Sequence, residues 1–257
     1  QNLMQLIGPG LGGALVAFTG ATVTFWVMAG LYAGAVMFTL RLPKVPVDGP
    51  VEVSGPARAG GFGDLVDGLK YVAHDPTIRT HILVNFGIVL LATPYSSMLP
   101  GFVKEVLGKG AAEQGVLVGF SGAGALIGSL VVASYPPRHR GRLLLAISTM
   151  LALGLIAFSF STSYYVTMPI MMFIGAGISL RMSVGQVILQ TYSAEAFRGR
   201  TVAVWMTQYS IVSFGTFAVG VLAEHAGPQV AIGGMAVVLL AFVAAVALFV
   251  PRYRNLQ

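Results

Sequence analysis

Long apolar stretches, interrupted by short polar breaks, constrain this sequence more than any other feature. Each stretch has about 20 residues, and an α-helix of that length crosses a hydrocarbon core about 30 Å thick. The pattern therefore predicts an all-α membrane protein with eight transmembrane helices. The predicted helices are Asn2–Phe18, Thr22–Leu40, Ile78–Leu99, Gln114–Ser134, Leu143–Phe160, Val166–Gln190, Val202–Leu222 and Ala231–Val250.

Lys and Arg residues gather in alternate breaks between these predicted helices. Short loops on the cytoplasmic side of a membrane accumulate basic residues, so the alternation indicates which way the helices run. Four alternate breaks hold only Lys104 and Lys109, whereas the other breaks, the first turn of Ile78–Leu99 and the C-terminal tail hold twelve basic residues. We therefore expect the segment Arg41–Pro76 and the C-terminus to lie in the cytoplasm.

The composition supports a membrane protein and argues against several other classes. Hydrophobic residues make up 56% of the chain and charged residues 9%, and the mean hydropathy is +0.81. The net charge of +6 follows the predicted topology, so it does not imply binding to nucleic acid. The chain has no cysteine and four dispersed histidines, which predicts no metal site and no cofactor. We do not expect an enzyme.

One break is much longer than the others and divides the chain into unequal parts. Residues 41–63 are rich in Pro and Gly, as is typical of a linker, and Asp64–His74 has the pattern of a short amphipathic helix on the membrane surface. Asp75 and Pro76 suit the N-cap and first turn of the next helix. We expect residues 1–40 to be the last two helices of a truncated six-helix bundle, 41–76 a cytoplasmic linker, and 77–257 a complete six-helix bundle.

Three motifs resemble those of major facilitator superfamily exporters. Gly8–Gly13 is similar to the GPxxGG core of the antiporter motif on the fifth helix. Asp67–Pro76 resembles the lead-in to the seventh helix in the branch of enterobactin exporters and macrolide efflux proteins. Leu189–Arg200 resembles the loop between the tenth and eleventh helices of that branch. The resemblance implies the major facilitator fold, with this chain covering helices five to twelve.

The same resemblance implies a function. Members of this branch export a small molecule, such as a siderophore, antibiotic or drug, across the bacterial cytoplasmic membrane by alternating access. The expected partners are membrane lipid, the substrate, protons as coupling ion and the missing N-terminal helices, in a monomer. In the antiporter motif, Gly8, Pro9, Gly12 and Gly13 would form a bend that limits leakage. An alternative is a self-contained eight-span channel subunit or a non-transporting scaffold.

Arg181 is the one Lys or Arg deep inside a predicted helix, since Arg79 lies in the first turn of its helix. A central arginine costs about 2.5–3.5 kcal/mol on insertion scales, so a functional role is expected. Gly177 and Gly185 lie one turn away on either side and leave room for its guanidinium. We consider a cavity charge that contacts an anionic substrate group or a carboxylate in the missing half, or alternatively an arginine that snorkels to the inner surface.

Further candidates are polar side chains and close-packing glycines. Asn85, Tyr95 beside Pro94, Gln186 and Gln208 are candidate substrate contacts or, alternatively, hydrogen-bond partners between helices, although Gln186 lies on another face of the helix from Arg181. The resemblance implies a cytoplasmic gate formed by Arg138, Arg142, Arg198 and Arg200, with Glu195 as a local partner of Arg198. Glycine pairs four residues apart predict close helix packing. These pairs are Gly8/Gly12, Gly30/Gly34, Gly115/Gly119 and Gly124/Gly128.

Overall fold

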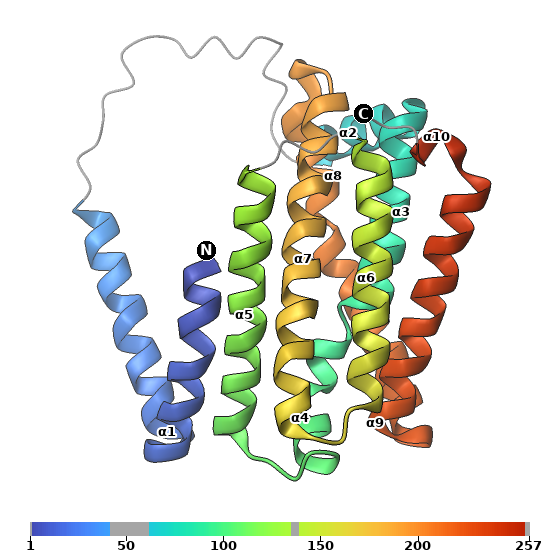
Figure 1. Cartoon of the computed structure of the whole chain (residues 1–257). Helices are drawn as coiled ribbons and strands as arrows, with labels where there is room; N and C mark the ends of the chain where they lie inside the picture. Colours follow the sequence, from blue (N-terminus) through green and yellow to red (C-terminus); the bar gives the residue numbers. More distant parts are fainter. Residues whose placement is uncertain (1, 42–61, 135–138, 255–257) are drawn as a thin grey trace.

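A computed structural model describes residues 2–41, 62–134 and 139–254, and these residues are helical without any strand (Figure 1). Apolar runs of this length can satisfy their backbone hydrogen bonds within a membrane only as helices or closed barrels. The elements are α1 (Asn2–Leu40), α2 (Phe62–His74), α3 (Pro76–Ala92), α4 (Tyr95–Glu105), α5 (Ala111–Ser134), α6 (Arg140–Phe160), α7 (Tyr164–Tyr192), the 3₁₀ turn η1 (Glu195–Phe197), α8 (Arg198–Met206), α9 (Gln208–Phe249) and α10 (Pro251–Arg254).

Six helical stretches within the described residues are long and apolar enough to cross a membrane. They are Thr22–Leu40, Pro76–Glu105, Ala111–Val131, Arg140–Phe160, Tyr164–Tyr192 and Arg198–Phe249. The last contains Gly227 in a non-helical conformation (φ 82°, ψ 161°), and Figure 1 shows α1 and α9 each turning back on itself. The prediction of an all-helical membrane protein is confirmed, whereas the count of eight spans stays a prediction.

Two sequence signals set the ends of α3 as expected. The Asp75 carboxylate accepts hydrogen bonds from the backbone N–H groups of Thr77 (2.8 Å) and Ile78 (3.1 Å), which makes it the N-cap. At the other end, α3 stops at Ala92 and α4 starts at Tyr95. Pro94 has no N–H to donate and its ring disturbs the preceding turn, so the predicted helix Ile78–Leu99 is broken there.

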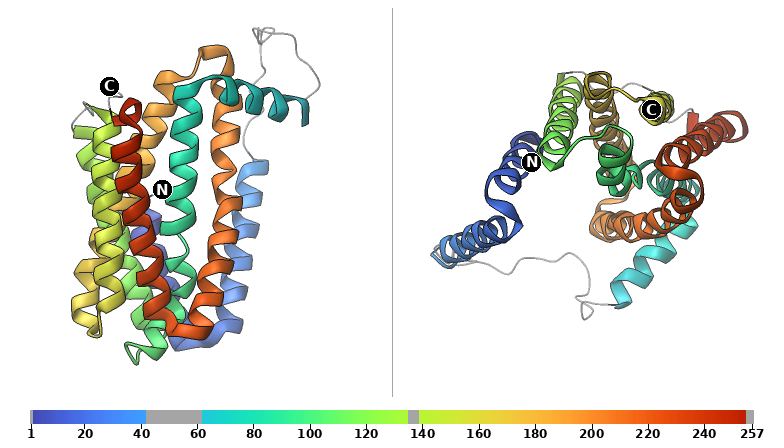
Figure 2. Two further views of the ribbon diagram at one scale, coloured as in Figure 1. Left: turned by 90° about the vertical axis from the view of Figure 1, so that its right-hand side faces the viewer. Right: turned by 90° about the horizontal axis from the view of Figure 1, so that it is seen from below.

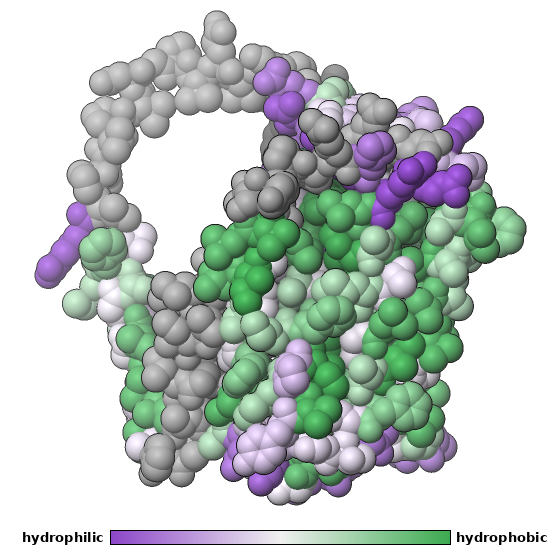
Figure 3. All heavy atoms as spheres, in the orientation of Figure 1, coloured by the Kyte–Doolittle hydropathy of each residue, from purple (hydrophilic) through white to green (hydrophobic). Residues whose placement is uncertain are grey.

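The hydrophobic core lies among α3, α4, α6, α7 and α9. The rings of Phe102 and Phe158 stack within it with centroids 4.3 Å apart, and Ile88, Ile174 and Leu239 belong to the same cluster and have no exposed surface. On the outer surface, apolar side chains form a band between two polar ends (Figure 3). The band is what a hydrocarbon layer requires, and the polar ends face water on either side of it.

The amphipathic segment forms α2, as predicted, but protein covers part of its apolar face. Figure 2 shows α2 lying across the end of the bundle rather than along its axis. Val72 is buried, and the Tyr71 ring stacks on Phe197 of η1 at 4.4 Å. Leu69 remains 49% exposed and is available to lipid. The helix therefore joins the α7–α8 connection to the predicted membrane surface.

Helices α5 and α7 approach each other through glycines. A Cβ atom at Gly124 would lie 1.7 Å from the carbonyl oxygen of Met172, and one at Gly128 would lie 2.8 Å from that of Ala176. The prediction of close packing at Gly124/Gly128 is thus confirmed. At Gly30 and Gly34, by contrast, no atom of the described residues lies within 4 Å of such a Cβ atom.

Candidate functional site: a polar cluster between three helices

Arg181 is buried in α7, with 5% of its surface exposed. The glycine four residues before it, Gly177, faces Leu151 of α6 at ordinary contact distance. The glycine four residues after it, Gly185, has room for no side chain, because a Cβ atom there would lie 2.8 Å from the Trp205 ring. Arg181 therefore lies in the helix interface and does not extend to the inner surface, so snorkelling does not occur.

Arg181, Asn85 of α3 and Gln208 of α9 form a hydrogen-bonded row, which we call the Arg181 cluster. The Arg181 guanidinium donates to Oδ1 of Asn85, and Nδ2 of Asn85 donates to Oε1 of Gln208 at 3.1 Å. Asn85 and Gln208 are buried, at 1% and 2% exposure. Three candidates that are far apart in the sequence thus meet at one place.

The order of donors in the Arg181 cluster is set by chemistry. A guanidinium only donates, so the oxygen of Asn85 must face it and the amide nitrogen must face Gln208. Nε2 of Gln208 is then left at the end of the row, buried and without a hydrogen-bond partner among the described residues. The cluster consequently offers one positive charge and a spare N–H donor, both suited to an acceptor group.

A second polar contact lies one helical turn away and was missed from the sequence. Nε2 of His81 donates to the carbonyl oxygen of Gly185 at 2.9 Å, and Nδ1 accepts from the hydroxyl of Tyr253 at 3.0 Å, which corresponds to a neutral ring. His81 also stacks on Trp205, with centroids 5.3 Å apart. The spacing of four residues from His81 to Asn85 and from Arg181 to Gly185 was the available signal.

The Tyr253 hydroxyl is held in its protonated form. Burial raises the pKa of Tyr253, which lies in α10 beyond the last apolar stretch. The neutral phenol can then donate to His81 across the whole physiological range. This bond joins the C-terminal end of the described chain to the row of polar contacts between α3 and α7.

We expect Tyr253→Phe to change how the stability of the protein depends on pH above neutrality. In the wild type, stability is complete below the ordinary phenol pKa of 10.0 and falls above it, because the unfolded chain ionises this phenol before the folded chain does. Tyr253→Phe should cost about 1 kcal/mol at neutral pH and lose less stability between about pH 9 and 11. Thermal denaturation at several pH values measures this. Tyr165→Phe, at an exposed site, is the control and should follow the wild type.

Two predicted cavity residues lie away from the Arg181 cluster. Tyr95 is 8% exposed within the hydrophobic core, where its ring meets Phe158 edge to face at 6.1 Å. Gln186 is exposed on a different face of α7, as helical periodicity indicated. The structure therefore does not bring these two side chains to the same place as Arg181.

The predicted gate arginines lie at the end of the molecule that carries α2, α8 and α10. Arg198 pairs with Glu195 at 3.9 Å, as expected, in an exposed ion pair. The Arg200 guanidinium lies over the Phe197 ring at 5.4 Å, and Arg142 is exposed at the start of α6. Arg138 lies outside the described residues. The pair at Arg198 contributes at most about 1 kcal/mol, because both charges are hydrated.

The residues of the antiporter-like motif lie in α1, whose helix continues through Gly8, Pro9, Gly12 and Gly13. Groups of His, Asp and Glu able to hold a metal ion are absent from the part of the chain that the structure describes.

Comparison with known proteins gives the family. The chain matches the transmembrane secretion effector family over residues 1–256. It is 27% identical over 267 residues to the multidrug efflux pump Tap of Mycolicibacterium fortuitum, covering 100% of this chain and 62% of that protein. It is 25% identical over 236 residues to Tap of Mycobacterium tuberculosis H37Rv, covering 88% of this chain and 54% of that protein.

A third relative is the uncharacterized MFS-type transporter YfmI of Bacillus subtilis, which is 23% identical over 258 residues, covering 93% of this chain and 60% of that protein. This chain thus spans little more than half the length of these relatives. The bacterial relatives and the apolar helices assign it to the inner membrane as a multi-pass protein. With nearly every residue matched, the chain belongs to the transmembrane secretion effector family of major facilitator superfamily transporters, which are not enzymes.

Proposed function

We propose that this chain is part of a secondary active exporter that moves a small molecule across the inner membrane by alternating access. The relatives named as multidrug efflux pumps support export, and a siderophore, antibiotic or drug is the substrate class. Eight transmembrane helices correspond to helices five to twelve of the major facilitator fold, with a linker at residues 41–76. Additional helices of the same protein complete the first bundle.

The observation that carries this proposal is the Arg181 cluster. A buried charge is costly in an apolar bundle and is retained where it serves a pathway or a site. Arg181 is hydrogen-bonded to a neutral partner, and no acidic side chain forms an ion pair with it among the described residues. Together with the spare donor of Gln208, it suits a substrate carrying a carboxylate, phosphate or carbonyl group.

The proposal includes the orientation of the protein in the membrane and the coupling of transport to an ion. The basic end of the molecule, with α2, α8 and α10, faces the cytoplasm, and so does the C-terminus. Protons are the coupling ion, and helices beyond these 257 residues supply the titrating carboxylate, because Glu105 and Glu113 lie near the ends of apolar stretches and Glu224 lies beside the turn at Gly227. The transporter works as a monomer, needs no cofactor and does not bind nucleic acid.

Transport by variants of Arg181 tests the proposal. In the full-length protein we expect Arg181→Ala to reduce efflux about tenfold to a hundredfold, because a charge-assisted hydrogen bond to substrate contributes about 1.5–3 kcal/mol. Arg181→Lys should retain part of the activity. Efflux of siderophores, macrolides and cationic dyes from cells is measured with and without a proton gradient.

A matched control lies on the same helix. Gln190→Ala, at an exposed position near the end of α7, should transport like the wild type. All variants are compared at equal amounts in the membrane. Full transport by both Arg181 variants would refute the role of the Arg181 cluster, and unchanged efflux after collapse of the gradient would refute proton coupling.

A further inference from the structure

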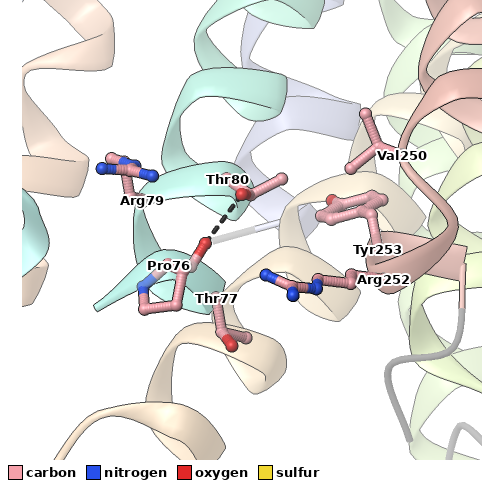
Figure 4. A pocket seen from close by; sticks show the side chains of 7 residues that line it. All are labelled: Pro76, Thr77, Arg79, Thr80, Val250, Arg252 and Tyr253. Atoms are coloured by element: carbon pink, nitrogen blue, oxygen red, sulfur yellow. Dashed lines mark hydrogen bonds between the residues drawn. The ribbon is translucent and has the colours of Figure 1, made fainter. Parts of the chain in front are cut away.

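A cavity of about 470 Å³ opens between the first turn of α3 and the short helix α10 (Figure 4). Its lining combines two arginines with threonine side chains. The residues that matter for its chemistry are Thr77, Arg79 and Thr80 of α3 and Arg252 and Tyr253 of α10. This cavity is separate from the Arg181 cluster and has no part in the function proposed above.

The cavity is positively charged. Figure 4 shows Arg252 extending from α10 toward Thr77, whereas the Arg79 side chain lies on the other side of the α3 turn. Nη1 of Arg79 donates to the carbonyl oxygen of Ala73 at 3.2 Å, which leaves its other N–H groups for a ligand. The carboxylate of Asp75 is nearby but accepts from the N–H groups that begin α3. Two arginines therefore outweigh one acid that is already bonded.

The position of the cavity along the bundle indicates what the ligand looks like. The apolar stretch Pro76–Glu105 begins at this cavity, and the stretch Arg198–Phe249 ends beside it. The cavity therefore lies where hydrocarbon gives way to the headgroup layer. Just below it on α9, Leu248 and Phe249 are 73% and 82% exposed, which places them against acyl chains.

We propose that this cavity binds the phosphate of an anionic phospholipid, with the acyl chains lying along Leu248 and Phe249. An arginine fork donates two parallel hydrogen bonds to phosphate oxygens, and the Thr77 hydroxyl adds a neutral donor, whereas the Thr80 hydroxyl already donates to the carbonyl oxygen of Pro76 at 2.7 Å. Basic pockets between transmembrane helices on the cytoplasmic side recognise anionic headgroups in this way. The bound lipid bridges the start of α3 and the end of α9, where α10 is only four residues long.

Lipid binding by the full chain tests the proposal. Native mass spectrometry of the detergent-purified protein titrated with phosphatidylglycerol should show one preferred lipid, and phosphatidylcholine should bind much more weakly. Arg79→Gln/Arg252→Gln should weaken the binding of phosphatidylglycerol about thirtyfold, since each basic residue near the headgroups contributes about 1 kcal/mol. Arg252→Lys, which keeps the positive charge, should weaken the binding of phosphatidylglycerol less.

The control removes the same charge elsewhere on the same face. Arg41→Gln/Arg142→Gln affects two exposed arginines outside the cavity and should bind phosphatidylglycerol within about twofold of the wild type. If both double variants lost the same affinity for phosphatidylglycerol, the lipid would bind to the basic surface as a whole, and the proposal would be overturned. Competition by millimolar inorganic phosphate would assign the cavity to a free anion and overturn the lipid assignment. Both lining arginines are exposed, and the melting temperature of the double variant verifies that it is folded.

Discussion

Replacing Gly124 or Gly175 with alanine is expected to destabilise the protein by more than about 1–3 kcal/mol, the usual cost of overpacking. The added methyl group at Gly124 would lie 1.7 Å from the carbonyl oxygen of Met172, and the one at Gly175 would lie 1.9 Å from that of Ser121. Both obstacles are backbone atoms, so a change of rotamer cannot relieve the clash. The helices must separate along their length, and α5 and α7 lose their contact.

The control has the opposite expected sign. A Cβ atom at Gly220 in α9 would have no atom within 4 Å among the described residues. Alanine is favoured over glycine in a helix interior by about 1 kcal/mol, so Gly220→Ala should be neutral or slightly stabilising. Thermal denaturation in detergent and the monodisperse fraction on size-exclusion chromatography measure both effects. If Gly124→Ala has the same melting temperature as Gly220→Ala, α5 and α7 do not approach each other as closely as described.

Asn85→Leu is expected to destabilise the protein more than Arg181→Met does, although it removes no charge. Leucine at position 85 would leave the buried guanidinium without its acceptor and Gln208 without its donor. Losing a hydrogen bond to a charged group costs about 1.5–3 kcal/mol. Arg181→Met removes the charge together with its desolvation penalty, and the flexible methionine side chain fills much of the space.

The double variant separates these contributions. Asn85→Leu/Arg181→Met should be more stable than Asn85→Leu alone, because no buried charge remains without a partner. The wild type, the two single variants and the double variant form a double-mutant cycle. Their denaturation in one detergent gives the coupling free energy between the two side chains. A double variant whose loss equals the sum of the single losses would show that Arg181 and Asn85 do not interact.

The sequence predicts the helical architecture because hydropathy and local signals act over one or two turns. Asp75 as the N-cap and the close packing at Gly124 are confirmed, whereas the helix predicted over Ile78–Leu99 is divided at Pro94. The count of spans is harder, since α1 covers the predicted break at residues 19–21 and α9 joins two helices across the kink at Gly227. The positive φ of Gly227 and the following Pro228 mark this turn.

The sequence predicts the individual residues of the Arg181 cluster but not their contacts with one another. Arg181, Asn85 and Gln208 each attract notice as polar groups in apolar stretches, but their order in one hydrogen-bonded row depends on how α3, α7 and α9 pack. His81 escaped notice because a lone histidine was judged only as a metal ligand, and its partner Tyr253 is 172 residues away. The proline before Tyr95 predicts a place at a cavity, whereas tertiary packing puts the Tyr95 ring in the core.

The break between α3 and α4 has a mechanical consequence. Because Pro94 donates no hydrogen bond, the carbonyl of Leu90 loses its helical partner, and Gly215 of α9 packs directly over that oxygen, with room for no side chain. The connection between α3 and α4 is therefore held against α9 by this close contact. Gly215 lies less than two turns beyond Gln208 on the same helix. The joint between α3 and α4 therefore packs against the helix that supplies one of the three side chains of the Arg181 cluster.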